Sequence, residues 1–466
     1  MTMDRSLPHV FFKPGTVAVV GASKKARFGS SIPGLLLRHG YQNNLYLVNP
    51  REKEINGLPV YTRLLDIPAP IDLVIILVPA PQAPSVIAEC IEKNVPAVVL
   101  ESAGFSEVSS EGALLEEEIR TLLQGTKTRV IGPNCLGVIN THESFSTTEV
   151  NLENLRPGNI GIIAQSGTFG NILVDWAPTQ GLFFSKLVTI GNRLDVDETD
   201  CLLYLADDDK TDVIVLYIEG VKNGRRFYEA TREVSRNKPI LIFKSGRSPA
   251  GRKAAASHTG SLTGEDELYE ALFRQSGVIR ATSFQELFDI ARVFSHEPTM
   301  AGPRVCVVTV SGSLGVMAAD ACTECGLELP DLSPKTVSTL REIAPAWMNV
   351  KNPLDVGPSG TFAAALKAVV TDPQINGVIA IPILPEVIMS HITELGIDIR
   401  SMYGDPEELR ILSPNKPIVL YTLGGPKWIE TIHKTYGQTF SLVSSLENAA
   451  RALSASFWYR KLSMQR

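Results

Sequence analysis

The sequence lacks the long hydrophobic runs that cross a membrane. Its longest candidate, residues 73–78, has the length of one strand and stops at Pro79, far short of the ~18 apolar residues that a membrane span requires. The first twelve residues include an acid, Asp4, and a proline, Pro8, with no apolar core, so they do not resemble a signal peptide. These absences exclude membrane insertion and predict a cytoplasmic protein.

Basic charge and cysteine are also scarce. The 44 Lys and Arg residues against 50 Asp and Glu give a net charge of −6, which leaves no broad cationic face for nucleic acid. Six cysteines are scattered without the spacing of a disulfide framework. Cys322 and Cys325 form a C-x2-C pair, but a structural zinc site takes four ligands and no second pair lies nearby. The sequence therefore predicts neither a nucleic-acid partner nor a metal site.

What the sequence does contain is an alternation of strands and helices. Its 466 residues suggest about three domains, and short β-branched runs alternate with helical patterns, as in parallel sheets with crossover helices. The class predicted is α/β. The strands expected in the first part are 17–20, 45–48, 73–78, 95–100 and 129–131, a five-strand Rossmann-like unit.

Two polar segments divide the chain. Residues 141–158 break the first alternation, and residues 296–303 contain two prolines and a glycine. Between them, strands are expected at 160–164, 186–189, 213–218 and 240–244, in a flavodoxin-like sheet. A third unit, also flavodoxin-like, has strands at 304–310, 377–383 and 417–422. The predicted domains are 1–145, 146–298 and 299–466.

A glycine loop follows the first strand. Gly21 and Ser23 stand at a strand-to-helix turn, where backbone N–H groups and the helix dipole can hold phosphate. The second strand ends near Arg51 and Lys53, instead of the acidic residue typical of NAD sites. These cations suit a phosphorylated ribose, either the 3′-phosphate of coenzyme A or the 2′-phosphate of NADP. An ordinary tight turn with solvent-facing cations is the alternative.

A run of small residues, 254–264, surrounds His258 and is expected to form a polar loop. Small residues let a phosphate or another backbone approach closely, and a histidine nucleophile needs an acceptor on one ring nitrogen to leave the other free. Glu219, at the end of the 213–218 strand, is the best-placed candidate for that acceptor. The alternatives are a solvated surface histidine and a strand-end acid that faces water.

Two similar loops each follow the first strand of a sheet. One contains Ser166, Gly167 and Thr168, and the other contains Gly312, Ser313 and Gly315. Helices that begin at these loops can direct their dipoles and free N–H groups at one phosphate from two sides. Simple loop geometry is the alternative.

Together these motifs resemble the α subunits of NDP-forming acyl-CoA synthetases, and most closely the ADP-forming acetyl-CoA synthetases of the succinyl-CoA synthetase superfamily. The resemblance covers essentially the whole chain. It rests on the segments 20–23, 132–137, 165–168, 218–220, 257–260, 311–315 and 352–357. The run around His258 is highly specific in combination with the others.

The resemblance implies a role for each matching residue. His258 corresponds to the phosphorylated histidine and Glu219 to the acid that orients it. Ser166, Gly167 and Thr168 match the first phosphate-binding helix start, and Gly312, Ser313 and Gly315 the second. The positions implied for coenzyme A are Gly21, Ser23, Lys53 or Arg51, Val78 and Pro79, with Asn134 near the thiol end.

The resemblance also implies a partner. No segment of this sequence is left to form an ATP-grasp module, and there is no P-loop pattern, so a separate ATP-grasp β subunit is expected to hold ADP or ATP and Mg²⁺ in an α2β2 assembly. The implied reaction interconverts a small acyl-CoA, with acetyl-CoA expected first, and the free carboxylic acid through an acyl phosphate and a phosphohistidine. A non-catalytic CoA-sensing module and, less favoured, an NADP-dependent reductase remain alternatives.

Overall fold

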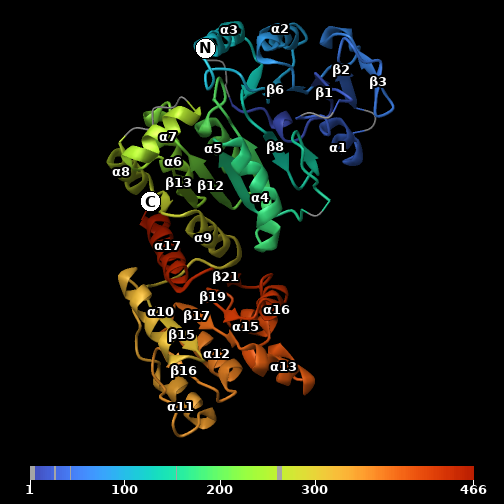
Figure 1. Cartoon of the computed structure of the whole chain (residues 1–466). Helices are drawn as coiled ribbons and strands as arrows, with labels where there is room; N and C mark the ends of the chain where they lie inside the picture. Colours follow the sequence, from blue (N-terminus) through green and yellow to red (C-terminus); the bar gives the residue numbers. More distant parts are fainter. Residues whose placement is uncertain (1–5, 26–27, 42–43, 154, 260–264, 466) are drawn as a thin grey trace. The chain divides into compact units, whose positions relative to one another are not determined.

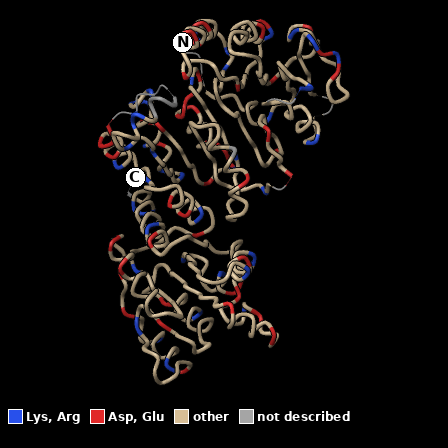
Figure 2. The backbone as a smooth tube through the Cα atoms, viewed as in Figure 1, with Lys and Arg blue, Asp and Glu red and all other residues tan. Residues whose placement is uncertain are grey.

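The computed structural model describes residues 6–25, 28–41, 44–153, 155–259 and 265–465, with the backbone alone at 171, 255–259 and 465. The chain forms two compact units, Met1–Arg280 and Ala281–Arg466 (Figure 1). Figure 2 shows that basic and acidic residues are interleaved along both units. No helix among the described residues is both long and apolar enough to span a bilayer.

The first sheet of unit 1 has seven strands, two more than expected. In sheet order they are β3 (Glu54–Ile55), β4 (Leu58–Tyr61), β2 (Leu45–Val48), β1 (Val17–Val20), β5 (Leu73–Ile76), β6 (Ala97–Leu100) and β7 (Arg129–Ile131). The five expected strands pair in parallel. The additional pair, β3 and β4, is an antiparallel hairpin at one edge. The prediction missed it because its two strands are short and mostly half-buried or exposed, so they give no hydrophobic run.

Both faces of this sheet are covered, which explains its continuous apolar strands. Alternate residues of β1 enter different cores: Val17 and Val19 lie with α1 (Ile32–Arg38), whereas Ala18 and Val20 lie with α2 (Ala83–Glu92) and α3 (Ser110–Leu123). Strand order reverses between β1 and β5, and ligands of such sheets bind where the carboxyl ends flank this point. Gly21 follows β1, and Val78 lies just beyond β5.

The second sheet of unit 1 contains the other predicted strands. Its order is β14 (Ile279–Ala281), β13 (Ile240–Lys244), β12 (Val213–Ile218), β10 (Ile160–Ala164), β11 (Phe184–Thr189), β8 (Gly137–Asn140) and β9 (Phe145–Ser146). Here β8 runs antiparallel to β11. Strand β8 of this sheet therefore precedes the predicted boundary at 145, and the edge strand β9 crosses it.

The order of this sheet reverses between β10 and β12, so the segments after these strands meet. Helix α4 (Gly167–Thr179) follows β10 and contacts β10 and β11. Helix α5 (Glu198–Asp207) contacts β10 and β12, and α6 (Gly224–Val234) packs on α5. The last helices are α7 (Pro249–Thr259) and α8 (Asp266–Ser276).

One expectation about the histidine segment is wrong. Residues 254–259 were expected in a loop, but their backbone belongs to helix α7. Three consecutive alanines, 254–256, explain the difference because alanine has the highest helix propensity. The backbone of His258 is thus helical; its side chain and residues 260–264 lie outside the described part of the chain.

Unit 2 has a parallel five-stranded sheet. Its order is β16 (Leu354–Asp355), β15 (Val305–Thr309), β17 (Gly377–Ile381), β19 (Ile418–Leu420) and β21 (Ser441–Leu442). A second, two-stranded sheet pairs β18 (Ile383–Leu384) with β20 (Leu423–Gly424). The helices are α9 (Phe284–His296), α10 (Gly312–Glu324), α11 (Pro334–Ile343), α12 (Phe362–Val370), α13 (Glu386–Glu394), α14 (Ile399–Tyr403), α15 (Pro406–Leu412), α16 (Pro426–Tyr436) and α17 (Leu446–Gln465). The predicted α/β class is confirmed in both units.

Candidate active site

The glycine loop after β1 is packed tightly against the end of β5. Gly21 has φ 91°, and a Cβ atom there would lie 3.0 Å from Cγ1 of Val78 and 3.1 Å from the carbonyl carbon of Leu77. Only glycine adopts this backbone conformation without strain. Ser23 is buried, and its hydroxyl accepts a hydrogen bond from the Lys25 N–H at 3.1 Å. The structure thus brings Gly21 and Val78 together; their contact with coenzyme A stays a prediction.

The backbone of Arg51, one of the two predicted cations, is linked to this loop through Asn49. The Asn49 side chain donates to the Ala22 carbonyl at 2.6 Å and accepts from the Arg51 N–H at 2.8 Å. Arg51, Lys53 and Pro79 are exposed. Asn49 therefore joins the Arg51 segment to the glycine loop, a link that the sequence analysis did not identify. A bare glycine loop with cations beside it fits a phosphorylated nucleotide.

A cavity of about 440 Å³ lies between the ends of the two sheets of unit 1. The segment after β7 reaches it with Asn134, whose backbone φ of 58° is left-handed. The N-terminus of α4 reaches it with Ser166, Gly167 and Thr168. The cavity therefore brings together Asn134 and three predicted phosphate-binding residues. The other lining residues are Phe28, Glu101, Ser102, Ala103, Cys135, Leu136, Gln165, Gly191 and Asn192.

The start of α4 suits an anion. Ser166 is the N-cap residue, and its side chain caps no N–H group within the part of the chain that is described. Gly167 fits closely against Leu136, since a Cβ atom would lie 3.1 Å from the Leu136 Cγ. The N–H groups of a first helical turn have no partner inside the helix. They are available to a phosphate, and the helix dipole favours its charge.

Glu219 is held at the end of β12 by Gln165. The Gln165 side-chain oxygen accepts from the N–H groups of Glu219 at 2.6 Å and Gly220 at 3.2 Å, and its amide donates to the Gly220 carbonyl at 2.6 Å. Glu219 is only 3% exposed, so the alternative of an acid facing water is wrong. Gln165 belongs to a predicted motif, but its hydrogen bonds to the Glu219–Gly220 turn could not be predicted from the sequence. They depend on the ends of β10 and β12 lying side by side.

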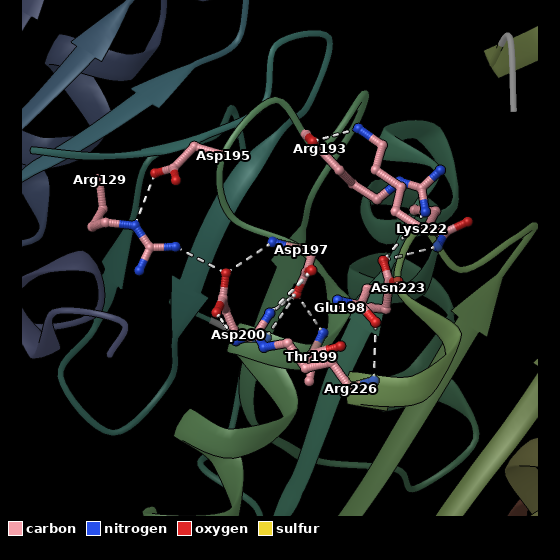
Figure 3. A network of polar contacts seen from close by, with 11 residues as sticks. Arg129, Arg193, Asp195, Asp197, Glu198, Thr199, Asp200, Lys222, Asn223 and Arg226 are labelled. Carbon is pink, nitrogen blue, oxygen red and sulfur yellow. Dashed lines mark hydrogen bonds and ion pairs between the residues drawn. The ribbon is translucent and has the colours of Figure 1, made fainter. Parts of the chain in front are cut away.

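A polar network contacts this turn, and Figure 3 shows Arg193, Glu198 and Lys222, which belong to it. Arg193 donates to the Gly220 carbonyl at 2.8 Å and lies 3.3 Å from Glu198, which is fully buried. Lys222 donates to the carbonyls of Asn192 and Arg193, and burial lowers its pKa to about 8. This network was not predicted, because its members lie on separate segments and share no sequence motif.

The second predicted phosphate-binding loop is in unit 2. Gly312 begins α10, and a Cβ atom there would lie 2.9 Å from the Asp355 carboxylate. The Ser313 hydroxyl is 2.9 Å from that of Ser311, and Gly315 packs against Pro353. This helix start is formed as predicted within its own unit. That this helix start binds the same phosphate as the start of α4 stays a prediction.

Family models match three consecutive parts of the chain. The CoA binding domain matches residues 15–141, the succinyl-CoA ligase like flavodoxin domain residues 157–294, and the Ligase-CoA domain residues 305–439.

Named relatives match as well. Acetate–CoA ligase [ADP-forming] II of Archaeoglobus fulgidus is 40% identical over 389 residues, 81% of this chain and 58% of the relative. The Methanocaldococcus jannaschii acetate–CoA ligase [ADP-forming] is 41% identical over 354 residues, 76% of this chain and 49% of the relative. The chain thus spans about half the length of these two relatives. The α subunit of acetate–CoA ligase [ADP-forming] I of Pyrococcus furiosus is 36% identical over 462 residues, with 97% of both chains covered.

A solved structure is similar to this chain in both fold and sequence. Acetyl-coenzyme A synthetase 1 of Ca. Korarchaeum cryptofilum, in complex with phosphate and ADP, matches with a TM-score of 0.85 and 30% identity over 98% of this chain and 97% of that one. The resemblance drawn from the motifs is confirmed. The chain belongs to the family of ADP-forming acetate–CoA ligases.

Proposed function

We propose that this chain is the α subunit of an NDP-forming acyl-CoA synthetase, which interconverts acyl-CoA, ADP and phosphate with carboxylic acid, CoA and ATP. The observation that carries the proposal is the cavity in which Asn134, from the CoA-binding part, meets the helix start at Ser166, Gly167 and Thr168. A thioester carbonyl and a phosphate need to be adjacent for the first step, and this cavity presents a binding group for each.

The reaction has three reversible steps. A phosphate oxygen attacks the thioester carbonyl, the carbon–sulfur bond breaks, and CoA leaves as its thiolate. His258 then attacks phosphorus, and the phosphorus–oxygen bond to the acyl group breaks to release the carboxylate. Finally, ADP takes the phosphoryl group from His258 as the phosphorus–nitrogen bond breaks. Positioning and charge stabilisation dominate such displacements.

Each predicted residue has a place in this scheme. Glu219 orients the His258 ring, and the α4 N-terminus stabilises the phosphate. We assign Gly312, Ser313 and Gly315 to the same phosphate from the second helix start. Coenzyme A binds along Gly21, Ser23, Val78, Pro79 and the cations Arg51 and Lys53. Burial of Glu219 and its fixed backbone support its role, since an orienting acid must keep one position.

We further propose an ATP-grasp β subunit that holds ADP or ATP with Mg²⁺, in an α2β2 assembly. The naming of the Pyrococcus furiosus relatives as α subunits supports a partner chain. The three domains are proposed at 1–145, 146–298 and 299–466, and the location is proposed to be cytoplasmic, where the CoA, ADP and phosphate pools are used. Acetate is the first acid to test. Family membership supports this function over an NADP-dependent reductase or a CoA sensor.

The test is ATP formation from acetyl-CoA, ADP and phosphate by the chain co-expressed with its ATP-grasp partner. We expect phosphate-dependent ATP formation that His258→Ala abolishes and Glu219→Gln lowers by about 100-fold or more, within the range of one positioned catalytic group. His391→Ala changes an exposed histidine of unit 2 and serves as the matched control. Equal activity of His258→Ala and His391→Ala would overturn the proposal.

A further inference from the structure

One carboxyl group of the cavity wall has no part in the proposed mechanism. Glu101 follows β6 at its carboxyl end and is 3% exposed. Its backbone N–H donates to the Ile76 carbonyl at 3.2 Å. It lines the same cavity as Asn134 and Ser166. Glu101 is thus a residue of the wall around the space where the acyl group and phosphate are proposed to meet.

The Glu101 carboxyl is unusual because it is unpartnered. Both oxygens are shielded from solvent, and neither has a hydrogen-bond partner among the residues that the structure describes. Its neighbour Glu107 differs: that carboxylate accepts from the Gly104 N–H at 2.7 Å and from the Asn192 side chain at 2.6 Å. A buried polar group without a partner costs free energy. Each such group in a native structure calls for an explanation, and at a cavity wall a bound group that supplies the missing hydrogen bond is one.

The surroundings of Glu101 contain further acids and a thiol. Burial, and next the nearby Glu149 charge, raise the pKa of Glu101 well above its usual range. Glu149 itself accepts from the N–H and hydroxyl groups of Ser31 at 3.0 and 2.7 Å. Cys135 is buried, lines the same cavity as Glu101, and donates weakly to the Leu100 carbonyl. No lysine or arginine is among the described residues of the cavity lining. No described residue of the cavity lining therefore donates a hydrogen bond to the Glu101 carboxyl.

The reacting groups do not supply that donor either. Phosphate and thioester oxygens accept hydrogen bonds, and the α4 N–H groups and Asn134 are available to them. The cavity volume of about 440 Å³ corresponds to about 15 water molecules at roughly 30 Å³ each. Phosphate and an acetyl group have eight non-hydrogen atoms between them, so these two groups alone do not fill the cavity.

We propose that Glu101 selects carboxylic acids whose acyl chain carries a hydrogen-bond donor, a hydroxyl or an ammonium group. The donor completes the hydrogen bonding of the buried carboxyl, whereas a methyl group in its place leaves that carboxyl unpartnered. Sites built to bind a substrate hydroxyl or amine reject the analogue that lacks it far more strongly than apolar pockets reject a methylene. This inference rests on the proposed function and names its substrate class.

The test compares acids of matched size with the chain and its ATP-grasp partner. 3-Hydroxypropionate and 3-aminopropionate are each compared with butyrate by kcat/KM, and acetate serves as the reference. We expect the wild-type chain to prefer a donor-bearing acid over butyrate by at least 10-fold, and Glu101→Leu to abolish or reverse that preference while kcat/KM for acetate stays within about 3-fold. Glu101→Gln separates the two donors, because its amide accepts from a hydroxyl but cannot neutralise an ammonium group.

Three controls make the result decisive. Glu149→Gln changes the neighbouring carboxyl and leaves the preference intact. Arg27→Gln changes a cation outside the described residues, next to Phe28 in sequence; the same loss of preference in that variant would assign the effect to a Glu101–Arg27 pair and overturn the proposal. Glu101→Leu is expected to unfold at the same temperature as the wild type or higher, since it removes an unpartnered carboxyl. A clearly lower temperature would show that the carboxyl already has a partner.

The remaining outcomes are distinct. An unchanged preference in Glu101→Leu, or a change confined to the KM for phosphate, would overturn the inference and leave the proposed function standing. Absence of activity with every acid, acetate included, in the presence of a nucleotide-binding partner would overturn the proposed function and this inference together.

Discussion

At the scale of single residues, Gln165 has the most demanding position in the candidate site. It bonds three backbone groups of the Glu219–Gly220 turn. Gln165→Met keeps the size but leaves these groups unpaired, at a cost of about 1–3 kcal/mol for a buried group. As Gln165 positions Glu219, we expect kcat to fall about 10- to 100-fold with little change in the KM for acyl-CoA. Steady-state kinetics check this, with Gln180→Met at the exposed end of α4 as the control. A change in KM alone would contradict the role.

Gly21 provides a second test at this scale. Gly21→Ala adds a Cβ atom 3.0 Å from Val78 in a left-handed conformation, whereas Gly40→Ala meets the same backbone strain at φ 96° with nothing within 4 Å. Gly40→Ala is expected to cost only the strain of about 1–2 kcal/mol. Gly21→Ala is expected to cost more and to weaken CoA binding about 10-fold, as measured by titration calorimetry. Equal CoA affinity in the two variants would place CoA elsewhere.

At the scale of elements, one ion network ties β7 of the first sheet to α5 of the second and to the segment before α5. Arg129 lies 2.8 Å from Asp195 and 2.9 Å from Asp200, and all three side chains are buried (Figure 3). Arg129→Leu leaves Asp195 buried without its guanidinium, whereas Asp200 keeps its ion pair with Arg226, so the free energy of unfolding is expected to fall by about 3 kcal/mol. Urea titration measures this. Arg225→Leu, at an exposed i,i+4 pair with Glu229, is expected to change nothing measurable; a similar effect of the two variants would contradict the argument.

How far the sequence predicts an element depends on how it is buried. Strands β1, β2, β7, β10, β12 and β13 have the predicted limits, because strands covered on both faces read as short apolar runs. Hairpin β3–β4 and strands β8 and β9 were missed, since edge pairing depends on tertiary contact more than on pattern. The alanine run before His258 was expected to be a loop although its local propensity is helical.

In the candidate site as well, residues in a local sequence motif were predicted, and residues that depend on tertiary contacts were not. Residues within glycine motifs, such as Gly21 and Ser166, were predicted because a helix start after a parallel strand has a recognisable sequence. Gln165 and Asn49 act through hydrogen bonds between segments far apart in sequence, and Glu101 comes to the cavity wall only through the fold. Their roles follow from the order of strands in each sheet and have no local signal.

At the scale of the whole molecule, the six cysteines behave as buried apolar residues. Five are fully buried, Cys325 is half-buried, and none forms a disulfide. Burial raises the pKa of each thiol above its usual value, to about 12 for Cys322. The folded chain therefore holds protons that the unfolded chain loses, so this contribution to stability is complete below the unfolded thiol pKa of about 8.5 and is lost as the pH rises above it.

Two measurements check the burial of the thiols and its effect on the free energy of unfolding. In the native protein at pH 8 we expect a disulfide reagent to react slowly, with Cys325 first, and to titrate six thiols after unfolding in urea. The free energy of unfolding should then fall between pH 9 and pH 10.5 less steeply in Cys90→Ala than in the wild type. Rapid reaction of several thiols in the folded chain would contradict the burial described.

The central claim for the whole molecule is that this chain carries the phosphoryl group itself. The most direct measurement is intact mass spectrometry of the chain after incubation with ATP and Mg²⁺ in the presence of its ATP-grasp partner, alongside His258→Ala. We predict one acid-labile phosphoryl group on the wild-type chain and none on the variant. A chain that stays unmodified beside a partner with verified nucleotide binding, or a variant that is labelled equally, would contradict the claim.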